Sequence, residues 1–137
     1  MSDSRRKRVL FVCVGNCCRS QMAEGFAAHY GSDVLAAESA GLAPAGIVVD
    51  ETIRAMAEKN IDISAQYSKA LRTDDANRFD LVVNMSGYDL PAGVRAPVRE
   101  WDVADPIGES DEIYAHVRDQ IERLVKSLIQ ELRYARE

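Results

Sequence analysis

Short apolar runs alternate with amphipathic segments along the whole chain. Residues 8–14 and 79–85 are short segments rich in apolar and β-branched residues, so they predict buried strands. A weaker strand is predicted at residues 34–41 and a short one at 98–101. Parallel strands need long crossover connections, and the segments between these runs are long enough to supply them.

Apolar residues recur at helical spacing in several of those connecting segments. A helix is predicted from Ser20, and Gly31 is placed to stop it; its inner face carries Met22, Ala23, Phe26, Ala27 and Tyr30. A second helix is expected to be capped by Asp50 and to end at Asn60. Thr73, followed by two aspartates, is typical of the cap and first turn of a short helix.

The last helix has the clearest period in the chain. Ser110 is expected to cap it, and Asp111 and Glu112 to occupy its first turn. Its apolar face consists of Ile113, Val117, Ile121, Leu124, Val125, Leu128 and Leu132. Together the elements predict a single-domain α/β fold: a central four-stranded parallel sheet with helices on both faces. Ligands of such sheets bind beyond the carboxyl ends of the strands.

The length and composition fit one globular domain. The chain has 137 residues, of which 47% are hydrophobic and 28% charged. Residues 1–8 are interpreted as a basic N-terminal tail and residues 9–137 as the domain. The longest apolar run, residues 9–14, is too short to cross a bilayer, and no run of signal-peptide length follows the tail. We therefore expect a cytoplasmic protein without a membrane partner.

The charge balance is acidic, with 17 basic and 22 acidic residues and a net charge of −5. Nothing in this balance favours binding to nucleic acid or to an anionic membrane. The basic cluster at residues 5–8 is interpreted as a solvated tail, with a local anchor for an anionic partner as the alternative.

All three cysteines lie within six positions, at Cys13, Cys17 and Cys18. A disulfide framework would spread an even number along the chain, so this spacing indicates thiol chemistry instead. Zinc binding is the weaker alternative, because the spacing is C-x3-C-C and the candidate ligands His29 and His116 belong to predicted helices.

The cysteines occupy a loop between the first predicted strand and the first helix. Backbone N–H groups and the helix dipole converge at such a helix start and favour an anion. Gly15 and Asn16 are residue types that tolerate positive φ, which a tight curl demands, and Arg19 matches two oxygens of a tetrahedral oxyanion. Cys13, at the start of the curl, is placed to attack a bound phosphate as a thiolate.

The motif C-x5-R-S, followed by QMAEGF, resembles the low-molecular-weight protein tyrosine phosphatases and the arsenate reductases that share their fold. The resemblance covers nearly the whole chain. It includes SAG at residues 39–41, IDIS at 61–64, DLVV at 80–83 and a W-x-x-x-D-P motif that ends at residue 106.

This resemblance implies the roles of the site residues. Cys13 would be the nucleophile, Arg19 the transition-state clamp, and Ser20 the hydrogen-bond partner of the sulfur. Asp105 would be the general acid and then the base; Asp102 competes for this role but has no proline after it. The phosphate would be bound by the loop residues Val14, Gly15, Asn16, Cys17, Cys18 and Arg19. The chemistry implied needs no metal or cofactor.

Further roles concern the loop itself. The resemblance implies that Asn16 and Ser39 brace it, and that Cys18 pairs with Cys13 to protect the nucleophile from irreversible oxidation. For Cys17 we favour the interpretation as a small, partly buried thiol.

Two branches of the family remain open on these residues. The QMAEGF segment is closer to the arsenate reductases, but no cysteine follows Cys18, and Met85 and Ser86 stand where thioredoxin-coupled reductases have a redox cysteine. The loop walls expected to receive a substrate ring are aliphatic, with Leu42, Ile47, Val48 and Ile107.

We therefore predict a cysteine-dependent phosphatase that hydrolyses aryl phosphate or phosphotyrosine through a thiophosphate intermediate. An arsenate reductase that uses an external small thiol or a glutaredoxin-like reductant is the alternative, and a non-catalytic binder of phosphate or phosphoprotein is a third interpretation. The expected partners are phosphate, arsenate or a similar oxyanion, together with a phosphotyrosine protein or a small thiol.

Overall fold

A computed structural model describes residues 5–136 of the chain. Their eight elements, in chain order, are β1 (Lys7–Cys13), α1 (Arg19–Gly31), β2 (Leu35–Gly41), α2 (Asp50–Ala57), α3 (Thr73–Ala76), β3 (Leu81–Asn84), β4 (Val98–Glu100) and α4 (Asp111–Arg136). The strands form a parallel sheet in the order β2-β1-β3-β4. The predicted α/β fold with a four-stranded parallel sheet is confirmed.

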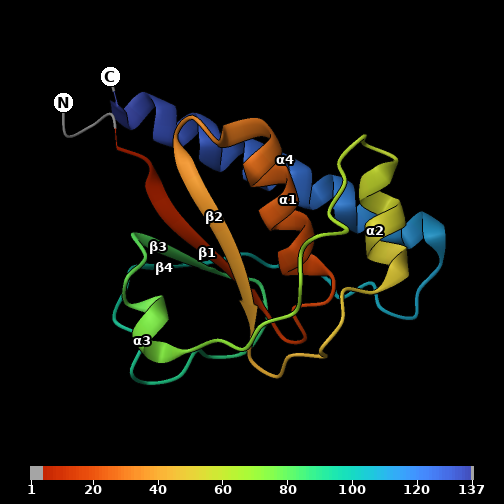
Figure 1. Cartoon of the computed structure of the whole chain (residues 1–137), viewed down its shortest axis with the longest axis horizontal. Coiled ribbons are helices and arrows are strands. Elements are labelled where there is room, and N and C mark those ends of the chain that lie inside the picture. Colours follow the sequence, from red (N-terminus) through yellow and green to blue (C-terminus); the bar gives the residue numbers. More distant parts are fainter. Residues whose placement is uncertain (1–4, 137) are drawn as a thin grey trace.

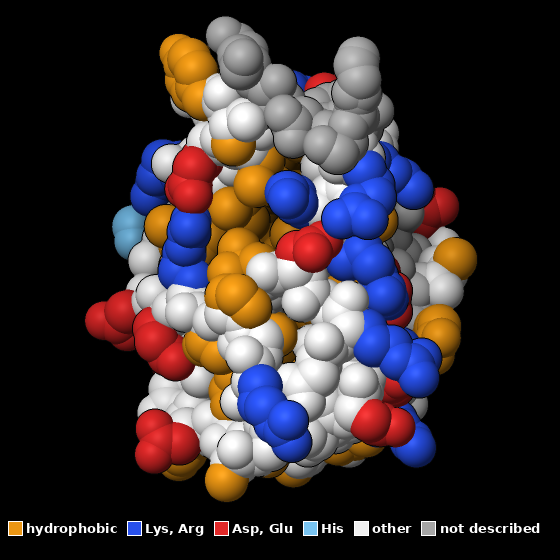
Figure 2. All heavy atoms as spheres, turned by 90° about the vertical axis from the view of Figure 1, so that its left-hand side faces the viewer, with side chains coloured by type: hydrophobic (Ala, Val, Ile, Leu, Met, Phe, Trp, Pro, Cys, Tyr) orange, Lys and Arg blue, Asp and Glu red, His pale blue; other side chains and the backbone are white. Residues whose placement is uncertain are grey.

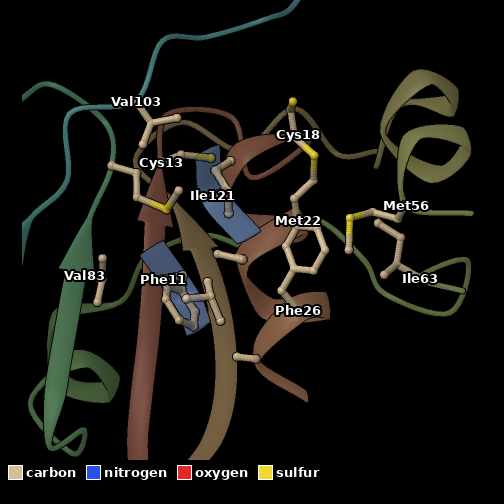
Figure 3. Packing of buried hydrophobic residues seen from close by; sticks show 14 of the residues in the cluster. Phe11, Cys13, Cys18, Met22, Phe26, Met56, Ile63, Val83, Val103 and Ile121 are labelled. Carbon is tan, nitrogen blue, oxygen red and sulfur yellow. The ribbon is translucent and has the colours of Figure 1, made fainter. Parts of the chain in front are cut away.

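Alternate side chains of β1 point to opposite faces of the sheet, and each face has its own apolar cluster. Phe11 belongs to the larger cluster, which α1 and α4 cover; Figure 3 shows it opposite Met22 and Phe26 of α1. Leu10 belongs to the smaller cluster. This cluster also contains Ala76, which lies in the single turn of α3. Figure 1 shows α1 lying across α4, with α3 apart from both. Helices thus lie on both faces, but loops complete the α3 side.

The starts of the elements differ in detail from expectation. Ser110 caps α4 as predicted, since its Oγ accepts from the backbone N–H of Ile113 at 3.3 Å. Asp50 and Thr73, expected as caps, are instead the first residues of α2 and α3, and neither helix has a side-chain cap. β1 begins at Lys7, one residue before the strand predicted at residues 8–14 and inside the segment interpreted as the tail; residues 1–4 of that tail lie outside the described part.

Gly31 is the last residue of α1, but it does not form the glycine cap that was expected there. The residue after it keeps right-handed helical geometry, so no left-handed cap is formed. A Cβ at Gly31 would lie 2.6 Å from Cδ1 of Ile129 on α4. The glycine therefore allows close approach of the two helices rather than a turn.

The two ends of the sheet differ in character. Figure 2 shows Lys and Arg side chains on one side of the molecule, with Asp, Glu and hydrophobic side chains among them. Four guanidinium groups at the end where β1 starts line a pocket of about 480 Å³ with Ala36 and Asp80: Arg5, Arg6, Arg8 and Arg78. At the opposite end Cys13 pairs with Gly41, so the loops that follow β1 and β2 begin side by side. Among the described residues, no helix is long and apolar enough to span a membrane.

Candidate active site

The loop between Cys13 and α1 curls as the sequence predicts, but Gly15 and Asn16 contribute to the curl in different ways. Asn16 has φ of +48°, in the left-handed region that asparagine tolerates. Gly15 is not in that region, so the expectation of positive φ there is wrong. The absence of a side chain at Gly15 instead avoids crowding, because a Cβ there would lie 3.0 Å from Sγ of Cys17.

Cys13 lies at the base of this loop and is 2% exposed. Its Sγ is 2.9 Å from the Oγ of Ser20, which also accepts a hydrogen bond from Nδ2 of Asn16 at 2.7 Å. The structure therefore brings together three of the residues expected to form the reactive centre. The distance between the sulfur and the hydroxyl oxygen is that of a hydrogen bond.

Arg19 is anchored by the loops that follow two other strands. Its Nη1 donates to the carbonyl oxygens of Met85 at 2.7 Å and Val103 at 3.0 Å, and the side chain is almost fully buried. Its Nη2 is 4.0 Å from Oδ2 of Asp105. These bonds hold the guanidinium plane in place beside the loop.

Asp105 lies at the mouth of the site with 53% of its side chain exposed, and its Oδ1 accepts from the backbone N–H of Ile107 at 3.1 Å. Asp102, the competing candidate, lines a separate pocket of about 210 Å³ with Trp101 and Val103. The ion pair with Arg19 is made by Asp105, which favours Asp105 as the carboxyl group of the site.

The hydroxyl of Ser39, which was expected to brace the loop, has its hydrogen bond to α1. Its hydroxyl donates to the carboxylate of Glu24 on α1 at 2.5 Å. Burial raises the pKa of Glu24, while the bond from Ser39 and the ammonium of Lys69, 3.9 Å away, oppose the shift. The direct contacts of Ser39 therefore tie β2 to α1.

Bracing of the loop comes instead from residues that the sequence analysis did not single out. Most belong to the connection between α2 and α3: Ser68 donates to the carbonyl of Gly15 at 3.2 Å, and the backbone N–H of Lys69 donates to Oδ1 of Asn16 at 2.8 Å. Gln21 on α1 is fully buried and donates to the same Oδ1 at 3.0 Å. In the sequence, the one sign of this bracing role was that Gln21 is a polar residue on the inner face of a helix.

The other two cysteines have different environments. Cys18 is 2% exposed, and burial raises the pKa of its thiol to about 12, although the hydroxyls of Thr52 and Tyr114 oppose the shift. Cys17 is half-buried, and burial, followed by the charges of Cys13 and Asp105, raises its pKa. All three cysteines are free, and the described residues contain no group of three or more side chains able to hold a metal ion.

Residues 8–92, which carry this loop and its braces, match the family described as low molecular weight phosphotyrosine protein phosphatase. The chain belongs to this family. Its members' fold is also the observed one, and the chain is an enzyme of that family.

Some proteins similar to this chain are named arsenate reductases and others are named phosphatases. The glutaredoxin arsenate reductase of Synechocystis sp. is 39% identical over 127 residues, which cover 90% of this chain and 96% of that protein. A solved arsenate reductase in the phosphate binding state is 37% identical, with a TM-score of 0.85 over 92% of this chain and 98% of the other. The YwlE arginine phosphatase from Geobacillus stearothermophilus is 25% identical, with a TM-score of 0.81 over 94% of each chain.

Proposed function

We propose that the protein is a cysteine-dependent phosphatase acting on aryl phosphates and phosphotyrosine. The observation that carries this proposal is the convergence on one loop of a sulfur in contact with Ser20, the anchored guanidinium of Arg19 and the carboxyl group of Asp105. Nucleophile, clamp and acid are the groups that two-step phosphate transfer through sulfur requires.

In the first step, the thiolate of Cys13 attacks phosphorus and the P–S bond forms as the ester P–O bond breaks. Nη1 of Arg19 is already bound to two carbonyls, so Nε and Nη2 face two oxygens of the transferring group. The backbone N–H groups of residues 14–19 bind the remaining negative charge. Asp105 gives its proton to the leaving oxygen.

In the second step, water attacks phosphorus and the S–P bond breaks, which releases phosphate and restores the thiolate. Asp105, now a carboxylate, takes the proton from that water. The hydroxyl of Ser20, 2.9 Å from the sulfur, stabilises the thiolate as it leaves.

Arsenate reduction is the second candidate, and the names of relatives 37–39% identical over about nine-tenths of the chain favour it. Arsenate is also tetrahedral, so Cys13 would attack As(V) in the same cradle; the S–As bond would form as an As–O bond breaks and hydroxide leaves. An external thiol would then attack the sulfur, giving a mixed disulfide and arsenite, with both electrons supplied by the two thiols. No cysteine follows Cys18, so a small thiol or a glutaredoxin-like protein is the required reductant. Reductants of this kind are cytoplasmic, so this candidate function goes together with a cytoplasmic enzyme.

A side-by-side assay decides between these reactions. The purified protein is given an aryl phosphate without added metal and, separately, arsenate with glutathione, mycothiol or glutaredoxin systems. We expect hydrolysis of the ester, abolished in Cys13→Ser and retained in Arg99→Lys, a surface control.

Reduction of arsenate with negligible hydrolysis would overturn the ranking in favour of the reductase. Binding of phosphate with neither turnover would assign a non-catalytic binder. Undiminished hydrolysis by Cys13→Ser would exclude both reactions as written.

A further inference from the structure

A continuous line of side-chain hydrogen bonds leads from the connection after α2 to the reactive sulfur. Nε2 of Gln66 donates to Oε1 of Gln21 at 2.7 Å, and Nε2 of Gln21 donates to Oδ1 of Asn16 at 3.0 Å. Nδ2 of Asn16 donates to Oγ of Ser20 at 2.7 Å, and that oxygen lies 2.9 Å from Sγ of Cys13. Every member except Gln66 is buried.

The direction of the bond at Asn16 is set by the backbone. The N–H of Lys69 can only donate, and it lies 2.8 Å from the side chain of Asn16, so the atom that faces it must be the oxygen. The amide nitrogen of Asn16 is therefore the atom that faces Ser20. No choice between the two ends of the amide is left open.

The direction at the two glutamines is fixed in the same way. Backbone carbonyls can only accept, and those of Tyr67 and Asn16 lie 2.9 and 3.0 Å from one end of the Gln21 amide. That end is therefore nitrogen, and the oxygen of Gln21 faces Gln66. The carbonyl of Gln21, 3.1 Å from the Gln66 side chain, requires nitrogen there too.

The consequence appears at the hydroxyl of Ser20. Because its oxygen accepts an N–H from Asn16, its own proton is available for the sulfur of Cys13. With the amide of Asn16 reversed, the hydroxyl would donate to the amide oxygen and the sulfur would lose its donor. A hydrogen-bond donor stabilises an ionised acceptor, and bonds in a buried chain reinforce one another.

We propose that Gln66 is a positioning residue for the nucleophile. The N–H of Lys69 orients the amide of Asn16, and Gln66 holds the amide of Gln21 against it, so that the Ser20 hydroxyl proton stays directed at Cys13. This rests on the proposed function in that it takes Cys13 as the nucleophile of the site. The side chain of Gln66 donates to Gln21 and reaches the sulfur only through the other members of the line.

The test substitutes Gln66→Met, which keeps the length of the side chain and removes its donor. The readout is the rate of iodoacetamide alkylation at Cys13 at pH 7, assigned by tandem mass spectrometry because Cys17 and Cys18 lie in the same peptide, together with kcat and KM for an aryl phosphate. We expect alkylation to slow about three- to tenfold, the effect of one hydrogen bond. Gln130→Met, on the exposed side of α4, should match the parent protein.

A Ser20→Ala background separates this role from general damage to the loop. If Gln66 acts through Ser20, Gln66→Met should cause no further loss of alkylation once Ser20 is absent. The same loss in both backgrounds, or no loss in either, would overturn the proposal. A rise in KM with kcat unchanged would also contradict it, because the line of bonds ends at the sulfur and not at the substrate.

The two proposals fail separately. Alkylation needs no phosphate ester, so a parent protein that does not hydrolyse esters defeats the proposed function while the alkylation comparison still decides the role of Gln66. Hydrolysis by the parent together with unchanged alkylation in Gln66→Met would defeat only the positioning role.

Discussion

At the scale of single residues, location rather than residue type separates the two candidate acids. Asp102 and Asp105 are both carboxyl groups near the carboxyl end of β4, but only Asp105 forms the ion pair with Arg19 in the described structure. A proton donor must reach the leaving oxygen, which lies opposite the attacking sulfur. The position of Asp105 beside Arg19 is the reason for proposing it as this donor.

Asp105→Asn should therefore slow esters with poor leaving groups much more than esters with good ones. Only poor leaving groups need the proton, and general acid catalysis contributes about 10²–10⁴-fold. The measurement is kcat/KM across a series of aryl phosphates of graded leaving-group pKa. Asp102→Asn is the matched control, and equal losses across the series in Asp105→Asn would reassign the acid.

Cys18 gives a pH-dependent prediction of its own. Pairing of Cys13 and Cys18 after oxidation stays a prediction: peroxide converts Cys13 to the sulfenic acid, and the Cys18 thiolate attacks its sulfur, releasing hydroxide as the disulfide forms. Because the pKa of Cys18 is raised to about 12, its thiolate fraction grows about tenfold per pH unit between pH 7 and 9.

The rate of disulfide closure should also rise about tenfold per pH unit between pH 7 and 9. Mass spectrometry of the linked peptide follows this rate. Cys18→Ser should instead pass to the irreversibly oxidised sulfinic and sulfonic acids. A closure rate independent of pH, or sulfonic acid alone in the parent protein, would remove the protective role from Cys18.

At the scale of elements, the end of β2 sets the shape of the catalytic loop. A Cβ at Gly41 would lie 2.7 Å from the carbonyl oxygen of Val14 and 2.9 Å from the backbone nitrogen of Asn16. Both are backbone atoms, so no flexible side chain can move aside. Glycine at this strand end is what allows the loop to close against β2.

Gly41→Ala should displace the loop, lowering the free energy of unfolding by about 1–3 kcal/mol and kcat/KM by up to about 100-fold. Gly31→Ala is the control, since it crowds α1 against α4 in a similar way at a distance from the loop. Denaturant unfolding and steady-state kinetics measure both effects. A loss of stability without a loss of activity in Gly41→Ala would show that the loop tolerates the shift.

At the scale of the whole molecule, Arg19 joins parts of the fold that are distant in sequence. Its Nη1 is bound to carbonyls 66 and 84 residues further along, in the loops after β3 and β4. The oxyanion site therefore exists only in the folded chain. A ligand that binds only the folded state stabilises that state by mass action.

Phosphate and arsenate should thus raise the melting temperature, with about 2.7 kcal/mol of stabilisation at 100 times the dissociation constant. Arg19→Lys should lose most of this shift because an ammonium cannot present two donors in one plane. Arg99→Lys, which alters a surface pair with Glu131, should keep it. Scanning calorimetry at constant ionic strength tests this, and an unchanged phosphate shift in Arg19→Lys would contradict the clamp.

The sequence by itself determined the parts of this protein that depend on neighbouring residues. The parallel α/β arrangement followed from strand and helix periods, and the reactive loop followed from Cys13, Asn16 and Arg19 lying between a strand and a helix. Such features need only local periodicity and the geometry of a helix start. Cap positions failed at Asp50 and Thr73, where a one-residue difference decides the outcome.

Only the tertiary structure decided what surrounds that loop. Ser39 turned to Glu24, the brace of Asn16 came from Lys69, and the anchor of Arg19 came from two backbone carbonyls. Backbone groups are the same in every residue, so no side-chain pattern marks which of them will meet a distant arginine or amide. Their partners are fixed when the sheet and its crossovers pack and each buried polar group must find a hydrogen bond.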